Sequence, residues 1–320
     1  MNTFNKEPVL YRPVEHSSPD NQYEYLLHKI LVSGKKKTSY HAKNKENEDS
    51  GHKYCLEIPG HMLQYYAPNG APISTVRDLG TMYKGAIGEV VGFLNGAHTL
   101  DQLKSFGCPN AFWKKWVTKD KCDVWGLEEG DLGPGSYGSV LTAIPMLSGK
   151  TFNQVRALER QMLNNPFNRT NLITTWYTPL DMGDREQNSP RKVVVAPCHG
   201  NIIQFDVMDD RSMNMTLYQR SADTPIGLAL NLSQWFAVGM MVAYVANLNF
   251  VWYTHFLPNA QIYDIQFDCV KNLIAREART LPRLYLRPQR EISSLTDFRK
   301  EDFELEQYNP HPKMDIPSAI

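Results

Sequence analysis

The sequence lacks an excess of charge of either sign, because 34 basic side chains balance 34 acidic ones over its 320 residues. Such a chain has no overall field that would hold nucleic acid or an anionic membrane, so an anionic ligand has to be bound locally. Closely spaced cysteine pairs are also lacking, which predicts neither a disulfide framework nor a zinc site, and no metal is expected. The five cysteines are Cys55, Cys108, Cys122, Cys198 and Cys269.

Residues 1–22 lack the apolar run of a signal peptide and are expected to form a loosely ordered N-terminal arm. Residues 224–263 lack Asp, Glu, Lys and Arg altogether, a feature that membrane spans share. Polar residues such as Asn231 and Ser233 interrupt this stretch, and its continuous apolar part has only the length of a core helix. We therefore expect a buried central helix, no membrane contact and a cytoplasmic protein.

The hydrophobic content of 42% is enough for one large core, and no repeat divides the chain, so residues 23–320 are expected to form a single domain. The polar stretch 35–52 predicts a long mobile loop. Apolar periodicity predicts helices at about 23–33, 81–95, 151–163 and 264–278. Short β-branched or alternating runs predict strands at 171–177, 191–197, 201–207, 214–220, 249–253 and 283–288. Helices and strands that come in blocks favour an α+β fold.

Cys198 is the first candidate for chemistry, because it follows an apolar run and a proline, where a turn exposes a thiol as a nucleophile requires. An inert core cysteine is the alternative. Arg220 could lower the pKa of such a thiol or clamp a phosphate, or it could form only a surface ion pair. Glu89 lies within an apolar helical segment, where burying a carboxylate is costly unless it is paired, so its presence there hints at a role. The segment 133–138 formally matches a dinucleotide-binding loop but follows an acidic turn rather than a strand.

Several segments resemble the thymidylate synthase family in their order and spacing, from residue 23 to the end of the chain. They are GEVVGFLNG (88–96), GDLGPGSYG (130–138), APCH (196–199), LYQRSAD (217–223), GLALN (227–231), REARTLPRL (276–284) and the ending 302–320. The resemblance implies a large mixed β-sheet covered by helices, with a sheet face used for dimerisation. It also implies transfer of a one-carbon unit from 5,10-methylenetetrahydrofolate to carbon 5 of a pyrimidine nucleoside monophosphate.

Carried over residue by residue, the resemblance assigns Cys198 as the thiolate that adds to carbon 6 of the ring. The side-chain amide of Asn231 would donate to O4 of uracil and accept from its N3–H. Cytosine presents the opposite order of donor and acceptor, so Asn231 argues for a uridylate. Glu89 would organise proton transfer through water. The other residues that the resemblance implicates are Tyr137 and His199 in catalysis, Gln219, Arg220, Ser221, Asp223 and Tyr263 at the nucleotide, and Trp113, Trp116, Asp223 and Ile320 at the folate.

The sequence departs from the family where the nucleotide phosphate and sugar would be held. One of three lysines, with Lys36 as the candidate, would replace an arginine of the family's first loop. Arg169, followed by Thr170, stands where the family has an arginine pair that reaches a second subunit, so a homodimer with shared phosphate ligands is expected. Gln261 stands where the family has a histidine.

These departures favour 5-hydroxymethylation of dUMP, in which water adds to the methylene intermediate and tetrahydrofolate is released. If the hydride of the folate is delivered instead, the product is thymidylate, and a divergent thymidylate synthase remains a close alternative. A CMP or dCMP hydroxymethylase and a non-catalytic nucleotide-binding protein are the further alternatives.

Overall fold

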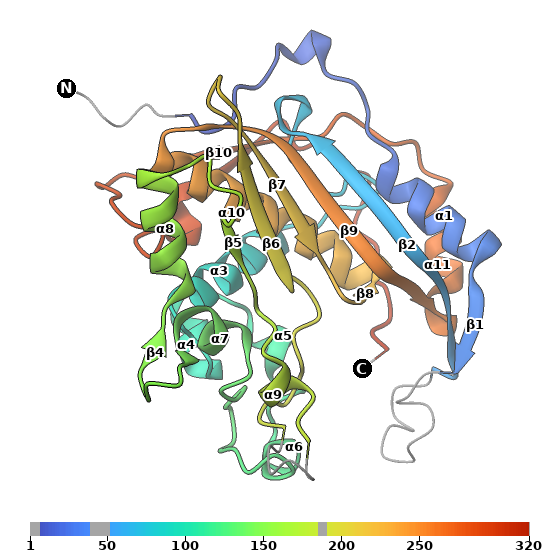
Figure 1. Cartoon of the computed structure of the whole chain (residues 1–320). Helices are drawn as coiled ribbons and strands as arrows, with labels where there is room; N and C mark the ends of the chain where they lie inside the picture. Colours follow the sequence, from blue (N-terminus) through green and yellow to red (C-terminus); the bar gives the residue numbers. More distant parts are fainter. Residues whose placement is uncertain (1–6, 39–51, 185–190, 320) are drawn as a thin grey trace.

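The computed structural model describes residues 7–38, 52–184 and 191–319, and a seven-stranded mixed sheet forms its centre (Figure 1). The strands follow the spatial order β1-β2-β9-β7-β6-β5, and β8 pairs with β9. Neighbours are antiparallel except for β7 and β8, which each run parallel to β9. The bounds are β1 Lys35–Thr38, β2 Tyr54–Tyr66, β5 Leu172–Ile173, β6 Ile202–Val207, β7 Ser212–Tyr218, β8 Ala222–Asp223 and β9 Asn249–Tyr263.

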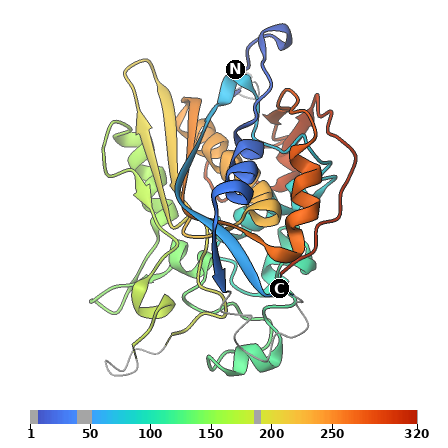
Figure 2. The same ribbon diagram turned by 90° about the vertical axis from the view of Figure 1, so that its right-hand side faces the viewer.

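Helices cover one face of this sheet (Figures 1 and 2). The helix α10 (Ala229–Ala246) contacts both β9 and α3 (Met82–Leu94), and α1 (Gln22–Ser33) packs on β2 and on α11 (Phe267–Ile274). Further helices are α4 (Leu100–Ser105), α5 (Asn110–Trp113), α6 (Lys119–Asp123), α7 (Tyr137–Thr142), α8 (Gln154–Asn164) and α9 (Thr178–Asp181). Single turns lie at Val14–His16, Ala67–Asn69, Thr224–Leu228, Asp264–Gln266 and Lys300–Asp302. Two small antiparallel pairs join β3 (Ile144–Pro145) to β4 (Thr151–Phe152) and β10 (Arg283–Leu286) to β11 (Phe303–Glu306).

The apolar helix α10 lies in the core. The stretch Thr224–Ala246 is long and apolar enough to cross a membrane, yet 89% of its most apolar window is buried inside the protein. The expected central helix is therefore confirmed as a core helix. Because water is excluded there, its polar side chains Asn231 and Gln234 have to find hydrogen-bond partners within the protein.

The two longest strands, β2 and β9, change the face that they bury near Gly60. On one side of this point Leu63 and Tyr65 lie in the main core, and on the other side Ile58, which is of the opposite parity, lies in it, whereas Cys55 packs with Tyr263 in a separate cluster. Gly60 has a φ of 54°, a left-handed conformation that glycine adopts without steric cost. The change of face turns the last residues of β9, including Tyr263, away from the main core and toward the C-terminal tail.

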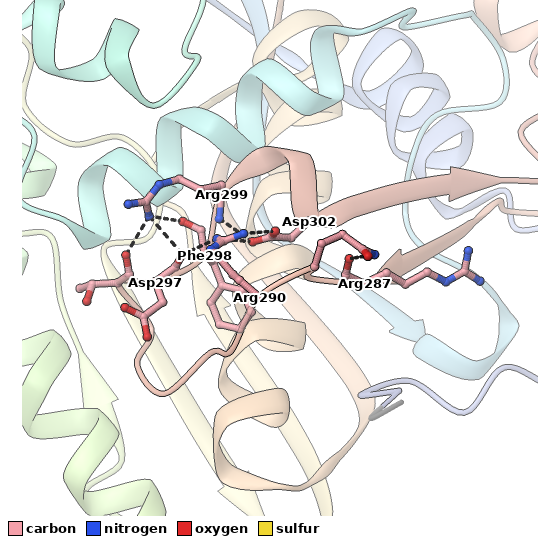
Figure 3. A network of polar contacts seen from close by, with 8 residues as sticks. Arg287, Arg290, Asp297, Phe298, Arg299 and Asp302 are labelled. Atoms are coloured by element: carbon pink, nitrogen blue, oxygen red, sulfur yellow. Dashed lines mark hydrogen bonds and ion pairs between the residues drawn. The ribbon is translucent and has the colours of Figure 1, made fainter. Parts of the chain in front are cut away.

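A cluster of charged residues fixes the segment between β10 and β11 (Figure 3). The carboxylate of Asp302 is 3% exposed and accepts two bonds from Arg290 at 2.6 and 2.9 Å. The guanidinium of Arg299 donates to the backbone carbonyls of Thr296, Asp297 and Phe298. These contacts hold the Phe298 side chain in the core, where it packs against α10.

Several segments differ from their predictions. Within the expected loose arm, Pro8 and Val9 pack on the core, since Val9 is 2% exposed and Phe250 N–H donates to the Pro8 carbonyl at 2.7 Å, while residues 13–16 are exposed. The start of the expected mobile loop forms β1, while residues 39–51 of that loop lie outside the described residues. The apolar run 191–197 is not a strand, and β2 is absent from the predictions.

Candidate active site

The loop that enters β6 holds Cys198 by its backbone. The N–H of Cys198 donates to the Tyr137 hydroxyl at 2.8 Å, and the same hydroxyl lies 3.5 Å from the Cys198 sulfur. At Gly200, φ is 61° and a Cβ would come within 2.1 Å of Trp235, so glycine is required for the loop to pack on α10. Cys198 is half-buried. The thiol is thus fixed in place while part of the residue stays accessible, as a nucleophile requires.

The charge of Arg220 acts on the same loop. Its Nε and Nη2 donate to the carbonyls of Pro197 and Ala196, each at 3.2 Å, and the guanidinium lies 5.5 Å from the centre of the Trp176 ring. Burial raises the pKa of the Cys198 thiol, whereas the hydrogen bond from Tyr137 and the positive charge of Arg220 lower it. Arg220 is itself exposed, so its remaining donors can reach an anion in solvent.

Ser221 also connects the segment after β7 to the loop that carries Cys198. Its N–H donates to the Cys198 carbonyl at 3.3 Å, and its hydroxyl donates to the Asn259 side chain at 3.1 Å. The segment that carries Arg220 and Ser221 therefore lies directly against the thiol loop. The structure brings these three predicted residues together.

Glu89 is buried where α3 meets α10. One carboxylate oxygen accepts the Trp113 indole N–H at 2.6 Å, and the other accepts the Gln234 side-chain amide at 3.1 Å. Burial raises the pKa of Glu89 to about 7, against the opposing effect of these two hydrogen bonds. Gln234 in turn accepts from the amide of Asn231 at 2.9 Å. Glu89 can therefore exchange a proton near neutral pH, as a general acid or base needs.

His199 was expected among the catalytic residues, but its ring lies in an aromatic stack behind the thiol loop. The ring packs 4.6 Å from Tyr137, and its Nδ1 accepts the Trp235 indole N–H at 3.0 Å. Tyr137 is stacked in turn on Phe93 at 4.5 Å. Burial lowers the pKa of His199 to about 3, so the ring is neutral. This arrangement supports the position of Tyr137 and does not place the imidazole at the thiol.

The C-terminal tail closes the other end of the site. Asp223 accepts from the amide of Gln266 at 3.2 Å, and Gln266 also donates to the Pro317 carbonyl at 3.2 Å. Ala319 is 1% exposed and packs with Tyr263 in a small buried cluster. Burial raises the pKa of Asp223 to about 7. Ile320 lies outside the described residues.

The thymidylate synthase family model matches residues 21–320. The chain belongs to the thymidylate synthase family. The mixed sheet with its helical cover is consistent with that fold. Membership supports an enzyme that transfers a one-carbon unit from a folate donor to a uridylate. In the part of the chain that the structure describes, no group of three or more His, Cys, Asp or Glu side chains could hold a metal ion.

The residues that depart from the thymidylate synthase pattern are only partly brought to the site. Gln261 lies beside Tyr263 and donates to its hydroxyl at 3.0 Å. In the sheet register, Lys37 pairs with Cys55, which pairs with Tyr263, so Lys37 shares their face. Lys36 lies on the opposite face, with its ammonium 4.3 Å from the centre of the Tyr54 ring. The structure therefore does not place Lys36 beside Tyr263.

Arg169 and Trp116 are the remaining predicted residues. Arg169 is exposed and lines a groove of about 570 Å³ on the open face of the sheet, together with Thr216 and Trp252. Trp116 is partly buried against the core, and its ring lies 5.4 Å from the ammonium of Lys121.

Sequence reasoning missed several buried polar groups near the site. Gln234 binds both Glu89 and Asn231, and its signal was a lone glutamine in an apolar helix. The imidazole of His52, at the end of the polar stretch, packs edge-on against Tyr263 at 4.9 Å. Asp181 is 3% exposed, and burial raises its pKa to about 7.

Proposed function

We propose that the protein transfers a one-carbon unit to carbon 5 of dUMP and that the product is the 5-hydroxymethyl nucleotide. The observation that carries the transfer is the position of Cys198, which is fixed by Tyr137 and lies in a loop whose carbonyls bind Arg220 and that also contacts Ser221. Few structural cysteines are half-buried, backbone-anchored and next to an exposed arginine. The arrangement fits a nucleophile beside a phosphate-binding group.

In this proposal the Cys198 thiolate forms a bond to carbon 6 of the uracil, and the electrons of the C5–C6 double bond move toward O4. Carbon 5 then becomes the nucleophile. An N–H of the Asn231 amide would stabilise the negative charge that develops on O4. Glu89, with a pKa near 7, would take up and return protons through water, and the bond to sulfur breaks when the product leaves.

The residues expected at the folate fit a pterin. A pterin presents N–H donors along one edge and an apolar face. The Asp223 carboxyl is an acceptor for such donors, and the Trp113 ring offers an apolar wall whose N–H is held by Glu89. Asp223, Trp113, Trp116 and the tail with Ile320 would hold the folate. When bound, 5,10-methylenetetrahydrofolate supplies the one-carbon unit.

The phosphate would be held by Arg220 and Ser221 of one subunit and by Arg169 of a second. Arg169 lies on the open face of the sheet, where it cannot serve the Cys198 site on the helical face of its own chain. A homodimer that pairs these open faces would bring it to the partner. Lys35 and Lys37 share the face of Gln261 and Tyr263, so they replace Lys36 as candidates for contact with the nucleotide.

We propose the hydroxymethyl product because the residues expected around the nucleotide differ from those of the family, above all Gln261 in place of a histidine. A divergent thymidylate synthase is the second candidate, and the closed tail favours it, because burial of Ala319 beside Tyr263 would exclude water from the reacting carbon.

The product identifies the reaction. We would incubate the protein with dUMP and 5,10-methylenetetrahydrofolate and measure the nucleotide by mass spectrometry and dihydrofolate by absorbance. Hydroxymethylation adds one CH2O unit and yields no dihydrofolate, whereas methylation adds one CH2 unit and yields dihydrofolate stoichiometrically. Cys198→Ser is the control and is expected to form neither product. A Cys198→Ser protein that kept full activity would refute both reactions.

A further inference from the structure

Asn231, the residue expected to read the base, has both ends of its amide bound by other buried amides. Its Oδ1 accepts from Nε2 of Gln219 at 3.0 Å, and its Nδ2 donates to Oε1 of Gln234 at 2.9 Å. Nε2 of Gln234 donates to Oε2 of Glu89 at 3.1 Å. Gln219 and Gln234 are both fully buried. Each amide therefore exchanges hydrogen bonds with protein groups rather than with bulk water.

The chain continues on the other side of Gln219. Oε1 of Gln219 lies 2.8 Å from Nε2 of His255, and Nδ1 of His255 lies 2.6 Å from the Tyr253 hydroxyl. Burial lowers the pKa of His255 to about 3, so its ring is neutral and has one N–H. With that proton on Nε2, the ring donates to Gln219 and accepts from Tyr253. His255 and Tyr253 are fully buried as well.

These bonds all run in one direction, toward Glu89. Gln234 presents its NH2 to Glu89 and its carbonyl oxygen to Asn231, which is the orientation that an ionised Glu89 carboxylate requires because it can only accept. Asn231 then has to present its NH2 to Gln234 and its oxygen to Gln219. If the Asn231 amide were rotated by half a turn, two NH2 groups would face each other and so would two oxygens. Buried groups without a partner make that rotation unfavourable.

A fixed amide matters because uracil and cytosine differ only in the order of their donor and acceptor. Uracil presents an acceptor at position 4 and a donor at N3, and cytosine presents the reverse. Asn231 has one N–H and one lone pair left for a ligand after its two protein bonds. A freely rotating amide could match either base, whereas an amide held in one orientation matches one base and opposes the other.

We propose that Gln234 is a specificity-determining positioning residue, which links Glu89 to Asn231, holds the Asn231 amide in one orientation and so makes the site select between uracil and cytosine. The inference rests on the proposed function, in which Asn231 contacts the pyrimidine edge. Gln234 acts through Asn231 and does not itself touch the substrate.

The test measures binding of dUMP and of dCMP by titration calorimetry without folate, so that it does not depend on the product formed. Gln234→Met keeps the length of the side chain but removes its amide, so that only Gln219 still opposes rotation of the Asn231 amide. The ratio of the two dissociation constants is expected to move toward one by about tenfold or more. Ser233→Ala is the control, because the Ser233 hydroxyl donates to the Leu230 carbonyl on the same helix and not to Asn231 or Gln234, and its ratio is expected to stay unchanged.

A second variant separates orientation from packing. In Gln234→Glu two neighbouring carboxyls share one proton at pH 6, so an oxygen of the new side chain still faces Asn231. The preference for dUMP is expected to be largely kept in Gln234→Glu although it is lost in Gln234→Met. If Gln234→Met does not fold, Gln234→Ala removes the same amide without adding bulk and replaces it in the comparison.

The outcomes separate the two proposals. A folded variant without the Gln234 amide that keeps the original dUMP to dCMP ratio overturns the role of Gln234 and leaves the uridylate function intact. An unaltered protein that binds dCMP as tightly as dUMP overturns the proposed substrate, and the role of Gln234 with it.

Discussion

At the scale of single residues, the hydroxyl of Tyr137 controls the Cys198 thiol, since it lies 3.5 Å from the sulfur and lowers the pKa of the thiol. Tyr137→Phe removes this bond, so the thiol pKa rises and less thiolate is present at a given pH. Alkylation of Cys198 by iodoacetamide at pH 8 is expected to slow by about tenfold, with its pH midpoint shifted upward. Peptide mass spectrometry over a pH series measures the rate at this cysteine.

Tyr285→Phe is the control for this change, because Tyr285 lies on β10, which pairs only with β11 in the described sheet topology. Its alkylation profile is expected to match that of the unaltered protein. An unshifted midpoint in Tyr137→Phe would mean that the tyrosine only supports the loop backbone.

Asp181 makes stability depend on pH. One carboxylate oxygen accepts the Tyr177 N–H at 2.6 Å, and the other has no hydrogen-bond partner among the described residues. Burial raises the pKa from 3.8 to about 7, so the folded protein binds this proton more tightly than the unfolded chain does. The stabilisation from the protonated form is therefore complete at low pH and is lost as the pH rises from about 4 to about 7.

Asp181→Asn keeps an acceptor for Tyr177 and carries no charge at any pH. The variant is expected to be about 1–3 kcal/mol more stable than the unaltered protein at pH 8, and similar to it at pH 4. Urea denaturation at both pH values gives the two free energies of unfolding. Asp206→Asn, at an exposed position on β6, is the control. An equal gain in stability in that variant would show that burial of the Asp181 carboxylate is not the cause.

The site residues that could be predicted from the sequence are those for which the proposed reaction needs one particular residue type. Cys198, Arg220 and Ser221 were predicted together, and the structure brings them together. The position of His199 behind the thiol could not be predicted, because it depends on Trp235, which comes from a helix distant in the sequence. The unpaired carboxylate oxygen of Asp181 could not be foreseen either, since burial of a loop residue is decided by packing.

At the scale of elements, the change of buried face in β2, called the kink below, depends on Gly60. Its φ is 54°, and nothing lies within 4 Å of where a Cβ would stand, so an alanine there meets only backbone strain. Gly60→Ala is expected to lower the free energy of unfolding by about 1 kcal/mol. Because the kink turns the ends of β2 and β9 toward the tail, the variant is also expected to raise the KM for the nucleotide. Denaturation and steady-state kinetics measure the two effects.

Gly80 provides a matched control, because it has the same φ of 54° and equally open space around it, but lies in a loop outside the sheet. Gly80→Ala is expected to lose similar stability while the KM stays unchanged. Equal KM values in the two variants would show that the kink does not position the nucleotide site.

Elements were predictable where one physical signal dominated. The continuous apolar run of α10 and the periodic faces of α1, α3 and α8 gave helices close to the observed bounds. The apolar run 191–197 is not a strand, because its backbone N–H groups donate to separate segments, such as Lys192 to Leu180 and Val194 to Leu132. β2 was missed because Pro59 and Gly60 interrupt its middle, where the structure has the kink.

At the scale of the whole molecule, the helices leave the opposite face of the sheet uncovered (Figure 2). Large apolar side chains are exposed there, and the rings of Tyr66 and Trp252 lie 4.8 Å apart. The most exposed members of the patch are Met62, at 54%, and Ile202, at 44%. A patch of this kind on a sheet favours association with a second copy of the chain. The groove that holds Arg169 lies on the same face.

If the open faces pair, each active site combines Cys198 from one chain with Arg169 from the other. Cys198→Ser and Arg169→Ala homodimers are then each expected to be nearly inactive. Random re-pairing of equal amounts gives half heterodimers, each with one site that carries both changes and one that carries neither, so about a quarter of the original activity returns. The measurement is turnover of dUMP after the variants are mixed in mild denaturant and refolded together, with each variant refolded alone as the control. Only a site shared between chains can be rebuilt by exchanging the chains. Activity that does not rise above those controls would therefore mean that Arg169 acts in the active site of its own subunit or has no role in the reaction.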